Sequence, residues 1–364
     1  MSAFCQRVDG TFSQFLRLSN RMHCVLKRRS MKKIKFLLAT VLAFVSTFAV
    51  ACTHDNNTIR ISEVTRSVFY APLYIAYNMD YFKDEGINMT FDIANGSDAV
   101  MTALISDEAD IGLLGPEAVV YIHNRNANKI PKVFAQLTAC DGSFLMGRSA
   151  ETDFNWANLK GKSIIGGRKA GLPAMSLEYA LKQAGLKPGA SLGENVDTVL
   201  DLTVDFVNTT SAFLAGTGDY VTAFEPSASM MVRNNNCHII TSVSTGSGTI
   251  PFTAFASMEN YLKKNPEKIE KFIRALKKGQ DYMLSATDAQ LIAALKPSFK
   301  STDDDILVSA VRNYISIGAY ADSFVLSETS WTKLQDVIES AGELKARVPY
   351  ANAIDCSYVT AMGY

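Results

Sequence analysis

Four short apolar segments in this sequence each run through a loop into a helix that starts near a proline. The prolines are Pro72, Pro116, Pro173 and Pro226. Proline suits the first helical turn because its missing N–H would have no partner there. In a parallel α/β sheet such loops all lie at the carboxyl ends of the strands, where small ligands bind. The pattern therefore predicts an α/β protein whose ligand site is lined by helix N-termini.

Residues 96–121 show this pattern in its most compact form. Ser97 and Asp98 are predicted to cap a helix, because short polar side chains can accept hydrogen bonds from its first N–H groups. Residues 111–114 form a short apolar run typical of a buried strand. The turn at 115–117 reads Gly-Pro-Glu, with an acid at the positive end of the next helix. We expect this stretch to form one wall of a ligand site.

The N-terminal region predicts export. Residues 31–51 combine a basic start, an apolar run and small residues before Cys52, as secretory signal peptides do. The apolar run, 36–50, is shorter than the roughly 20 residues of a membrane-spanning helix. Cys52 follows Ala51 as in a bacterial lipobox, which predicts a lipid anchor. Ordinary cleavage after Ala51 stays open, because the box is imperfect.

The chain outside the signal peptide divides into a leader, a tether and a mature protein. Residues 1–30 read as an over-extended reading frame or a long basic leader, and residues 52–57 as a short polar tether. Beyond residue 51 there are 27 Lys and Arg against 35 Asp and Glu, a net charge of −8. This balance gives no electrostatic case for nucleic acid binding.

Three cysteines remain in the mature chain, namely Cys140, Cys237 and Cys356. They are odd in number and lack the spacing of metal ligands, so we expect buried thiols, with one disulfide left open. We expect no metal and no cofactor.

Composition predicts two lobes. The stretch 141–158 is rich in Gly, Ser, Asp and Asn, and 245–249 is a second flexible connector. We therefore assign residues 58–140 and 246–364 to lobe I and residues 141–245 to lobe II. Two of the four proline junctions fall in each lobe, which favours a cleft shared between them. The segment after residue 250 reads as mainly helical.

Several motifs in order carry a family resemblance. They are 69–76 (Phe-Tyr-Ala-Pro-Leu-Tyr-Ile-Ala), 81–87, 96–121, 158–162 and 224–226 (Phe-Glu-Pro). With them, residues 58–360 resemble the periplasmic substrate-binding proteins of ABC importers, in the branch for nitrate, sulfonates, taurine and thiamin pyrimidine precursors. The resemblance implies a type II fold, two α/β lobes joined by a two-strand hinge with the ligand enclosed between them. It also implies a membrane permease powered by a separate ATPase, since this chain has no P-loop.

The candidate ligand contacts combine these patterns. Tyr70 ends the first strand region and could stack on a planar ligand or pack in the core. Phe224 and Glu225 stand where the family places an aromatic and an acid before proline. The glycine turns at Gly115 and Gly171 let the backbone approach a ligand. The hinge crossing contributes a carboxyl group and a hydroxyl, from Asp141 and Ser143. The full set is Tyr70, Gly115, Glu117, Asp141, Ser143, Gly171, Phe224 and Glu225.

The ligand class stays open between two chemistries. Aromatic and acidic candidates favour an aminated, thiamin-pyrimidine-like heterocycle, whereas Arg168 and Lys169 keep a sulfonate or nitrate open. We expect a monomeric solute-binding protein rather than an enzyme. An enzyme on the same fold is the alternative, disfavoured by isolated cysteines and the export signal. A ligand sensor for a membrane receptor is a further alternative, because a sensor would also close its two lobes around the ligand.

Overall fold

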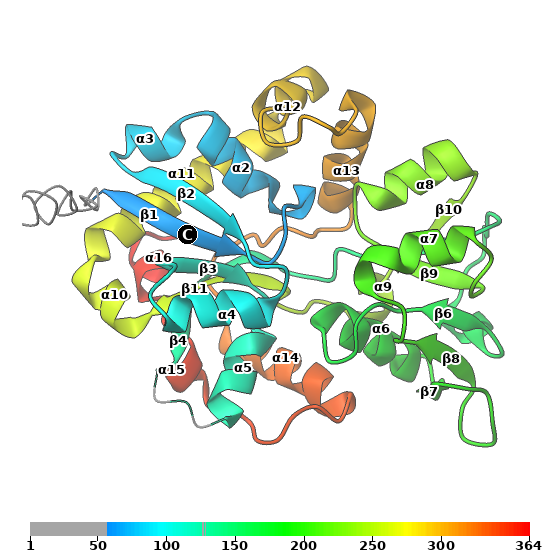
Figure 1. The fold of residues 1–364 in the computed structure, drawn as a ribbon. Helices are drawn as coiled ribbons and strands as arrows, with labels where there is room; N and C mark the ends of the chain where they lie inside the picture. The colour runs from blue at the N-terminus through cyan, green and yellow to red at the C-terminus, as the bar shows by residue number, and fades with distance from the viewer. Residues whose placement is uncertain (1–56, 126, 128) are drawn as a thin grey trace, which may run out of the picture. The chain divides into compact units, whose positions relative to one another are not determined.

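The computed structural model describes residues 57–125, 127 and 129–364. The predictions for the signal peptide, for Cys52 and for most of the tether lie outside these residues. Residues 57–364 form one compact unit that contains two β-sheets (Figure 1). Within the described part of the chain, no helix is both long and apolar enough to cross a membrane.

The first sheet has the strand order β2-β1-β3-β11-β4. Strand β1 pairs in parallel with β2 and β3, while β11 runs antiparallel to β3 and β4. Every residue of β3 is buried, which confirms the strand predicted at 111–114. The strands are β1 (Thr58–Glu63), β2 (Asn88–Ile93), β3 (Ile111–Leu114), β4 (Pro131–Thr138) and β11 (Thr253–Met258).

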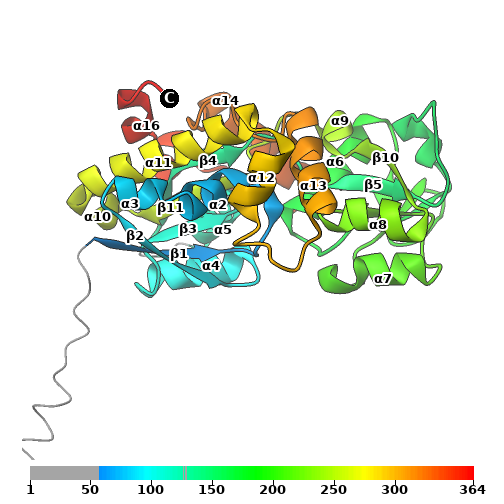
Figure 2. The same cartoon turned by 90° about the horizontal axis from the view of Figure 1, so that it is seen from above.

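Helices cover both faces of the first sheet. Helices α2 (Ala71–Asn78), α3 (Tyr81–Asp84) and α11 (Pro266–Ser285) lie on one side, and α4 (Ser97–Ile105) lies on the other (Figure 2). Helix α4 packs closely on β3, since a Cβ added at Gly112 would lie 2.7 Å from Val100 Cγ1. This close packing fixes the start of α4 beside the end of β3.

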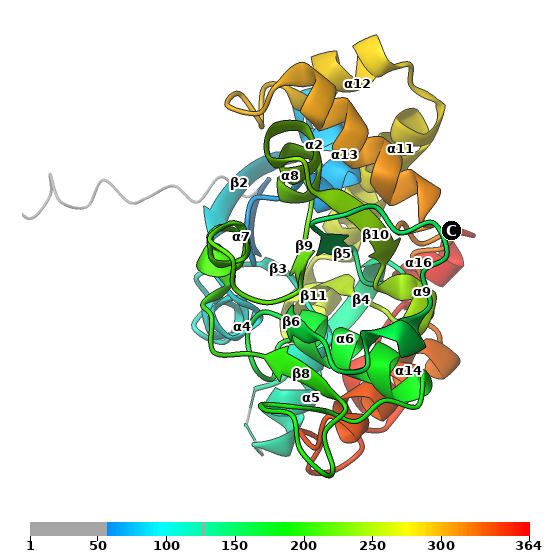
Figure 3. The same cartoon turned by 90° about the vertical axis from the view of Figure 1, so that its right-hand side faces the viewer.

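The second sheet has the order β10-β5-β9-β6-β8-β7. Helices α6 (Leu172–Gln183) and α9 (Ser244–Ser247) lie on one face, and α7 (Thr209–Leu214) and α8 (Ser227–Asn235) on the other (Figure 3). The strands are β5 (Phe144–Gly147), β6 (Ser163–Ile165), β7 (Pro188–Gly189), β8 (Thr198–Asp201), β9 (Tyr220–Ala223) and β10 (His238–Ser242).

The chain passes between the two sheets at 139–143 and again at 243–252. These segments are tied together, because Ile250 N–H donates to Ala139 O (2.9 Å) and Phe252 N–H donates to Thr138 O (3.1 Å). The strands of each sheet come from the residues predicted for one lobe. The lobe boundaries themselves stay a prediction.

The segment after residue 250, predicted to be mainly helical, begins with the strand β11, which the sequence did not indicate, and is helical beyond it. The helices not named above are η1 (Val68–Tyr70), α5 (Glu117–Asn124), η2 (Trp156–Leu159), η3 (Phe206–Asn208), α10 (Glu259–Lys264), α12 (Asp288–Leu295), α13 (Asp304–Ser316), α14 (Glu328–Ser340), α15 (Tyr350–Ala353) and α16 (Ser357–Ala361).

The four proline junctions all lead into helices, as predicted. Pro72 and Pro173 stand within the first turns of α2 and α6. Pro116 and Pro226 stand directly before the first helical residue, as the N-cap residues of α5 and α8.

Candidate functional site

Glu117 begins α5 directly after β3 and is only 6% exposed. Its carboxylate folds back over Gly115, where an added Cβ would lie 2.6 Å from Glu117 Cδ. Burial raises the pKa of Glu117 to about 7, and its own backbone N–H and the Ser97 hydroxyl offset only part of that increase. The oxygen Oε2 is buried without a hydrogen-bond partner. The structure thus holds a carboxyl group with unused acceptor capacity at the start of a helix.

Ser97 has a different role from the predicted cap. Helix α4 begins one residue earlier than expected, with Gly96 as its N-cap, so Ser97 and Asp98 lie inside the first turn and neither makes a capping hydrogen bond. The prediction of side-chain caps is therefore wrong. Instead, Ser97 Oγ accepts a hydrogen bond from Gly115 N–H (3.1 Å). Ser97 thereby ties the start of α4 to the turn that positions Glu117.

A second buried acid, Glu63, ends β1 and was not identified from the sequence. Its carboxylate accepts hydrogen bonds from the Tyr74 hydroxyl and from Arg66 Nε (2.9 Å). Burial raises the pKa of Glu63 despite these partners. The only sequence signal was an acid at the end of an alternating strand.

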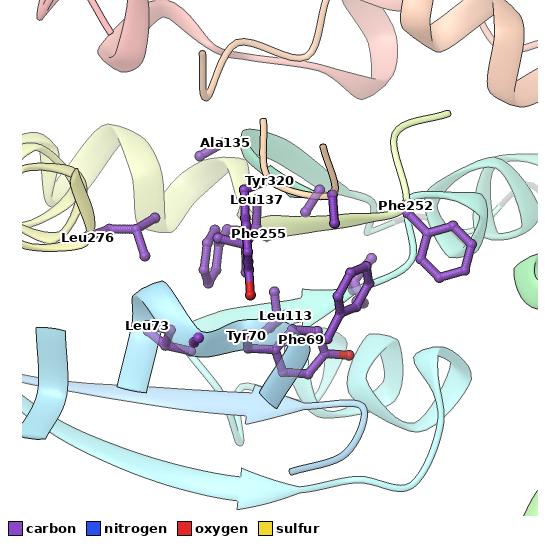
Figure 4. Packing of buried hydrophobic residues seen from close by; sticks show 14 of the residues in the cluster. Phe69, Tyr70, Leu73, Leu113, Ala135, Leu137, Phe252, Phe255, Leu276 and Tyr320 are labelled. Carbon is purple, nitrogen blue, oxygen red and sulfur yellow. The ribbon is translucent and has the colours of Figure 1, made fainter. Parts of the chain in front are cut away.

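Tyr70 lies close to both buried acids. Burial and the nearby Glu63 and Glu117 carboxylates raise the pKa of its phenol. Its ring centroid lies 6.1 Å from that of Phe69, and both rings belong to the buried cluster that also contains Leu113 of β3 (Figure 4). Tyr70 is 4% exposed, so it packs in the core. Stacking of this ring on a ligand stays a prediction.

Asp141 and Ser143 lie in the first crossing segment, and both are fully buried. Ser143 N–H donates to Asp141 Oδ1 (2.7 Å). Burial raises the pKa of Asp141 to about 7, offset in part by this amide. Asp141 Oδ2, Ser143 Oγ and Ser176 Oγ on α6 are buried and make no hydrogen bond of ordinary geometry, but the Ser143 and Ser176 hydroxyls also lower the pKa of Asp141 and therefore lie close to its carboxyl group. Ser176 was missed, because a serine within an apolar helical pattern carries no signal of its surroundings.

Tyr121 connects α5 to the start of α6. It stands one turn after Glu117 on α5, and burial and that carboxylate raise its pKa. Its hydroxyl donates to Ala170 O (3.1 Å) and lies 3.5 Å from Met175 Sδ, next to Ser176. The middle of α5, beside the first sheet, thus touches the start of α6, beside the second.

Gly171 is the N-cap of α6 and sits at this junction. Its N–H donates to Arg168 O (3.2 Å), and an added Cβ would lie 3.2 Å from the same oxygen. The backbone here leaves little room for a side chain. A contact between Gly171 and a ligand stays a prediction.

Glu225 is buried like Glu117, but its carboxylate is used within the protein. Ser229 N–H (3.0 Å) and Ser229 Oγ (2.9 Å) donate to it from α8, and Asn313 Nδ2 (2.6 Å) donates from α13. Glu225 N–H also donates to the Tyr314 hydroxyl (2.9 Å). These bonds tie α8 to α13. A ligand contact through Glu225 stays a prediction.

Phe224 packs among other aromatic side chains. Its ring centroid lies 6.0 Å from that of Phe69 and 6.1 Å from that of Phe252. Phe224 thus lies beside Phe69, which precedes Tyr70 in the chain, and beside Phe252 in the second crossing segment. Its contact with a ligand stays a prediction.

The charges around these groups are predominantly acidic. The described residues include no buried Lys, Arg or His side chain. Arg168, a candidate for anion binding, is exposed and pairs with Asp98 at 3.4 Å. The described residues also contain no cluster of His, Cys, Asp and Glu that could hold a metal ion. What the arrangement offers a ligand is chiefly hydrogen-bond acceptors.

Comparison with solved structures defines the class of fold. The periplasmic aliphatic sulphonate binding protein SsuA from Escherichia coli superposes with a TM-score of 0.65 over 82% of this chain and 98% of its own, at 15% identity. The chain therefore has the fold of the periplasmic binding proteins, as the sequence predicts. It belongs to the NMT1/THI5 like family, whose model matches residues 68–289.

Two relatives match this chain to different extents. A Bacillus subtilis (strain 168) protein that carries the name of a binding protein, YtlA, is 36% identical over 85% of this chain and 91% of its own length. The 4-amino-5-hydroxymethyl-2-methylpyrimidine phosphate synthase THI12 of Saccharomyces cerevisiae is 27% identical over 60% of this chain and 64% of its own. The first relative is a near full-length match, whereas the second covers less of both chains.

Proposed function

We propose that this chain is the exported solute-binding component of an ABC importer, which captures a small polar solute and delivers it to a membrane permease. The observation that carries this proposal is a set of buried oxygens without hydrogen-bond partners, with Glu117 Oε2 at the start of α5 and Asp141 Oδ2 in the first crossing segment. Buried polar atoms in native proteins nearly always have partners, and a ligand supplies them here. The likeness to YtlA over most of both chains supports a binding role.

An enzyme on this fold is the second candidate, and the likeness to the THI12 synthase favours it. The thiols of this chain are poor nucleophiles, however. Burial raises the pKa of Cys140 to about 12 and that of Cys356 to about 11, so neither is a thiolate near neutral pH. Cys140, Cys237 and Cys356 are all buried, as the sequence predicts, and all free, so the disulfide that the sequence left open does not form among them. We therefore prefer binding without chemistry.

The binding function is tested with the purified protein. Native mass spectrometry would reveal a small molecule that copurifies, and isothermal titration would measure its affinity. We expect one molecule bound per chain, released unchanged, and loss of its uptake when the gene is deleted. Conversion of the bound molecule into a product would contradict the proposal and favour the enzyme. Normal uptake in the deletion strain would favour a sensor.

The finer features of the proposal concern anchoring and ligand. We propose that Cys52 carries the lipid that holds a monomeric protein on the outer face of the membrane. Replacing Cys52 by alanine should then move the protein from the membrane fraction to the soluble fraction. For the solute, the proposal includes a thiamin-pyrimidine-like heterocycle and a sulfonate or nitrate type of anion.

A further inference from the structure

We propose that Arg233 on α8 and the acids Asp303 and Asp305 at the start of α13 form an ionic latch between the two proposed lobes. The latch holds the lobes together in the absence of solute and loosens as the ionic strength rises. It goes beyond the proposed function, because it acts on the protein without its solute and does not depend on which solute is bound. It joins the two lobes because α8 follows β9 of the second sheet, whereas α13 follows β11 of the first.

The contact between Arg233 and the two acids has the geometry of a fork. The guanidinium donates from Nη1 to both carboxylate oxygens of Asp305 (3.0 and 3.1 Å) and from Nη2 to Asp303 Oδ2 (2.7 Å). Its Nε donates to Asn234 Oδ1 (3.1 Å), so every guanidinium nitrogen is bonded. A planar fork that binds two carboxylates at once is geometrically more specific than a single exposed ion pair.

The charges of the latch stand at helix ends that suit them. Arg233 lies in the last turn of α8, Asp303 is the N-cap residue of α13, and Asp305 lies in its first turn. The two helices lie side by side (Figure 1, Figure 3). A cation at a helix C-terminus and acids at a helix N-terminus each interact favourably with the helix dipole. The two helices therefore present complementary charges to each other.

Helix α13 is fastened to its own side by separate ion pairs. Lys296, which follows α12, pairs with Asp304 (2.6 Å), the residue between the two acids of the latch. Arg312, further along α13, pairs with Asp288 at the start of α12 (2.8 Å). Release of Arg233 would therefore free α8 from α13 at this point without freeing α13 from α12.

A buried hydrogen bond at the same junction reports whether the latch holds. Glu225 N–H, two residues before α8, donates to the Tyr314 hydroxyl on α13 (2.9 Å), and Glu225 is only 2% exposed. We expect this amide to exchange its hydrogen with solvent when α8 and α13 separate. When reclosing is faster than exchange, the exchange rate is proportional to the separated fraction.

The chain contains a matched control pair on the same helix. The side chains of Arg312 and Asp288 are 39% and 65% exposed, against 37% and 65% for Arg233 and Asp305. Both pairs include α13, but Arg312 and Asp288 belong to the same proposed lobe. Replacing Arg312 thus removes an equivalent ion pair from α13 and leaves the contact with α8 in place.

The experiment is hydrogen exchange of the purified full chain, followed by mass spectrometry of peptides that contain Glu225. We expect Arg233→Gln to raise the exchange rate at Glu225 about two- to tenfold at about 50 mM sodium chloride, because two exposed ion pairs are lost. At about 500 mM the wild-type rate should approach that of the variant, because salt screens exposed charges. Arg312→Gln should change the rate less than about twofold.

A double-mutant cycle tests the pairing itself. Asp303→Asn together with Asp305→Asn should raise the exchange rate at Glu225 about as much as Arg233→Gln does. Adding both to Arg233→Gln should have little further effect, because the interaction is already lost. Independent, multiplying effects would overturn the pairing.

Three further results would overturn the latch. One is an equal exchange rate in the wild type and in Arg233→Gln at low salt. Another is the same increase in Arg312→Gln, because the effect would then come from the stability of α13. The third is an equal increase in strands β3 and β11, because a released latch leaves the first sheet intact. Each would leave the binding function standing, since the copurifying solute tests that function separately.

Discussion

At the scale of single residues, three glutamates next to prolines show how environment assigns different roles to similar sequence. Glu267 is exposed and pairs with Lys271 (2.7 Å) on the same helix. Glu225 is buried with its carboxylate bonded to Ser229 and Asn313. Glu117 is buried with one oxygen unpartnered. Of the two buried glutamates, Glu117 alone has a carboxyl oxygen without a hydrogen-bond partner.

Glu117 should make the ligand-free protein less stable as the pH rises. Its pKa is about 7 in the folded protein and near 4.5 in the unfolded chain, so the protonated group favours folding below about pH 4.5 and that contribution is lost through pH 7. We expect Glu117→Gln to raise the free energy of unfolding at pH 8 by up to roughly 3 kcal/mol, and to change it little at pH 4.5. Urea unfolding at both pH values measures this. A variant with the same pH dependence as the wild type would contradict it.

Gly115 should be required for the position of that carboxylate. A Cβ at Gly115 would lie 2.6 Å from Glu117 Cδ, so Gly115→Ala must displace the side chain. We expect a loss of about 1–3 kcal/mol in the free energy of unfolding, as overpacking of buried sites usually costs. Gly193→Ala is the control, because an added Cβ there meets no atom within 4 Å. Urea denaturation compares the two, and equal stabilities would refute the role of Gly115.

At the scale of elements, the sequence predicts those helices and strands that depend mainly on the pattern of neighbouring residues. The strand at 111–114 and the helices after the four prolines depend on neighbouring residues, and these predictions are confirmed. The prediction that Ser97 caps α4 is wrong because the helix begins one residue earlier, at Ser97 itself. Where α4 begins depends on its packing against β3. Glu63 and Ser176 were missed because their burial arises only when distant segments meet.

The junction between α8 and α13 should depend on its buried hydrogen bonds more than on its surface ion pairs. Asn313 Nδ2 donates to the buried Glu225 carboxylate, whereas Arg233 pairs with Asp303 and Asp305 at the surface. We expect Asn313→Ala to cost about 1–3 kcal/mol, because a bond to a buried charged group is lost. Arg233→Gln should cost less than about 1 kcal/mol, as exposed ion pairs do. Thermal unfolding of both variants tests this order, and the reverse order would contradict it.

At the scale of the whole described unit, elements beside the two sheets touch at several separate places. Tyr121 on α5 bonds to Ala170, the Lys333 ammonium on α14 lies 4.0 Å from the Tyr179 ring centroid on α6, and the Lys182 ammonium bonds to Ser340 O. Two crossing segments, at 139–143 and 243–252, provide the covalent connection. A few polar contacts together with two short connecting segments are typical of domains that move relative to one another.

The last prediction is that ligand binding closes the two proposed lobes about these crossing segments. Glu117 on α5 and Asp141 in the first crossing segment both have buried oxygens without partners, and Tyr121 on α5 contacts Met175 on α6, so a ligand that bonded to both acids would hold the two sides together. We expect the copurifying solute, at saturating concentration, to reduce the radius of gyration measured by small-angle X-ray scattering. Tyr121→Phe, which removes the bond to Ala170 O, should shift the ligand-free protein toward the open form and weaken binding by roughly two- to tenfold. Glu267→Gln should leave both unchanged, and a radius of gyration that ligand does not alter would show that residues 57–364 bind it as one rigid body.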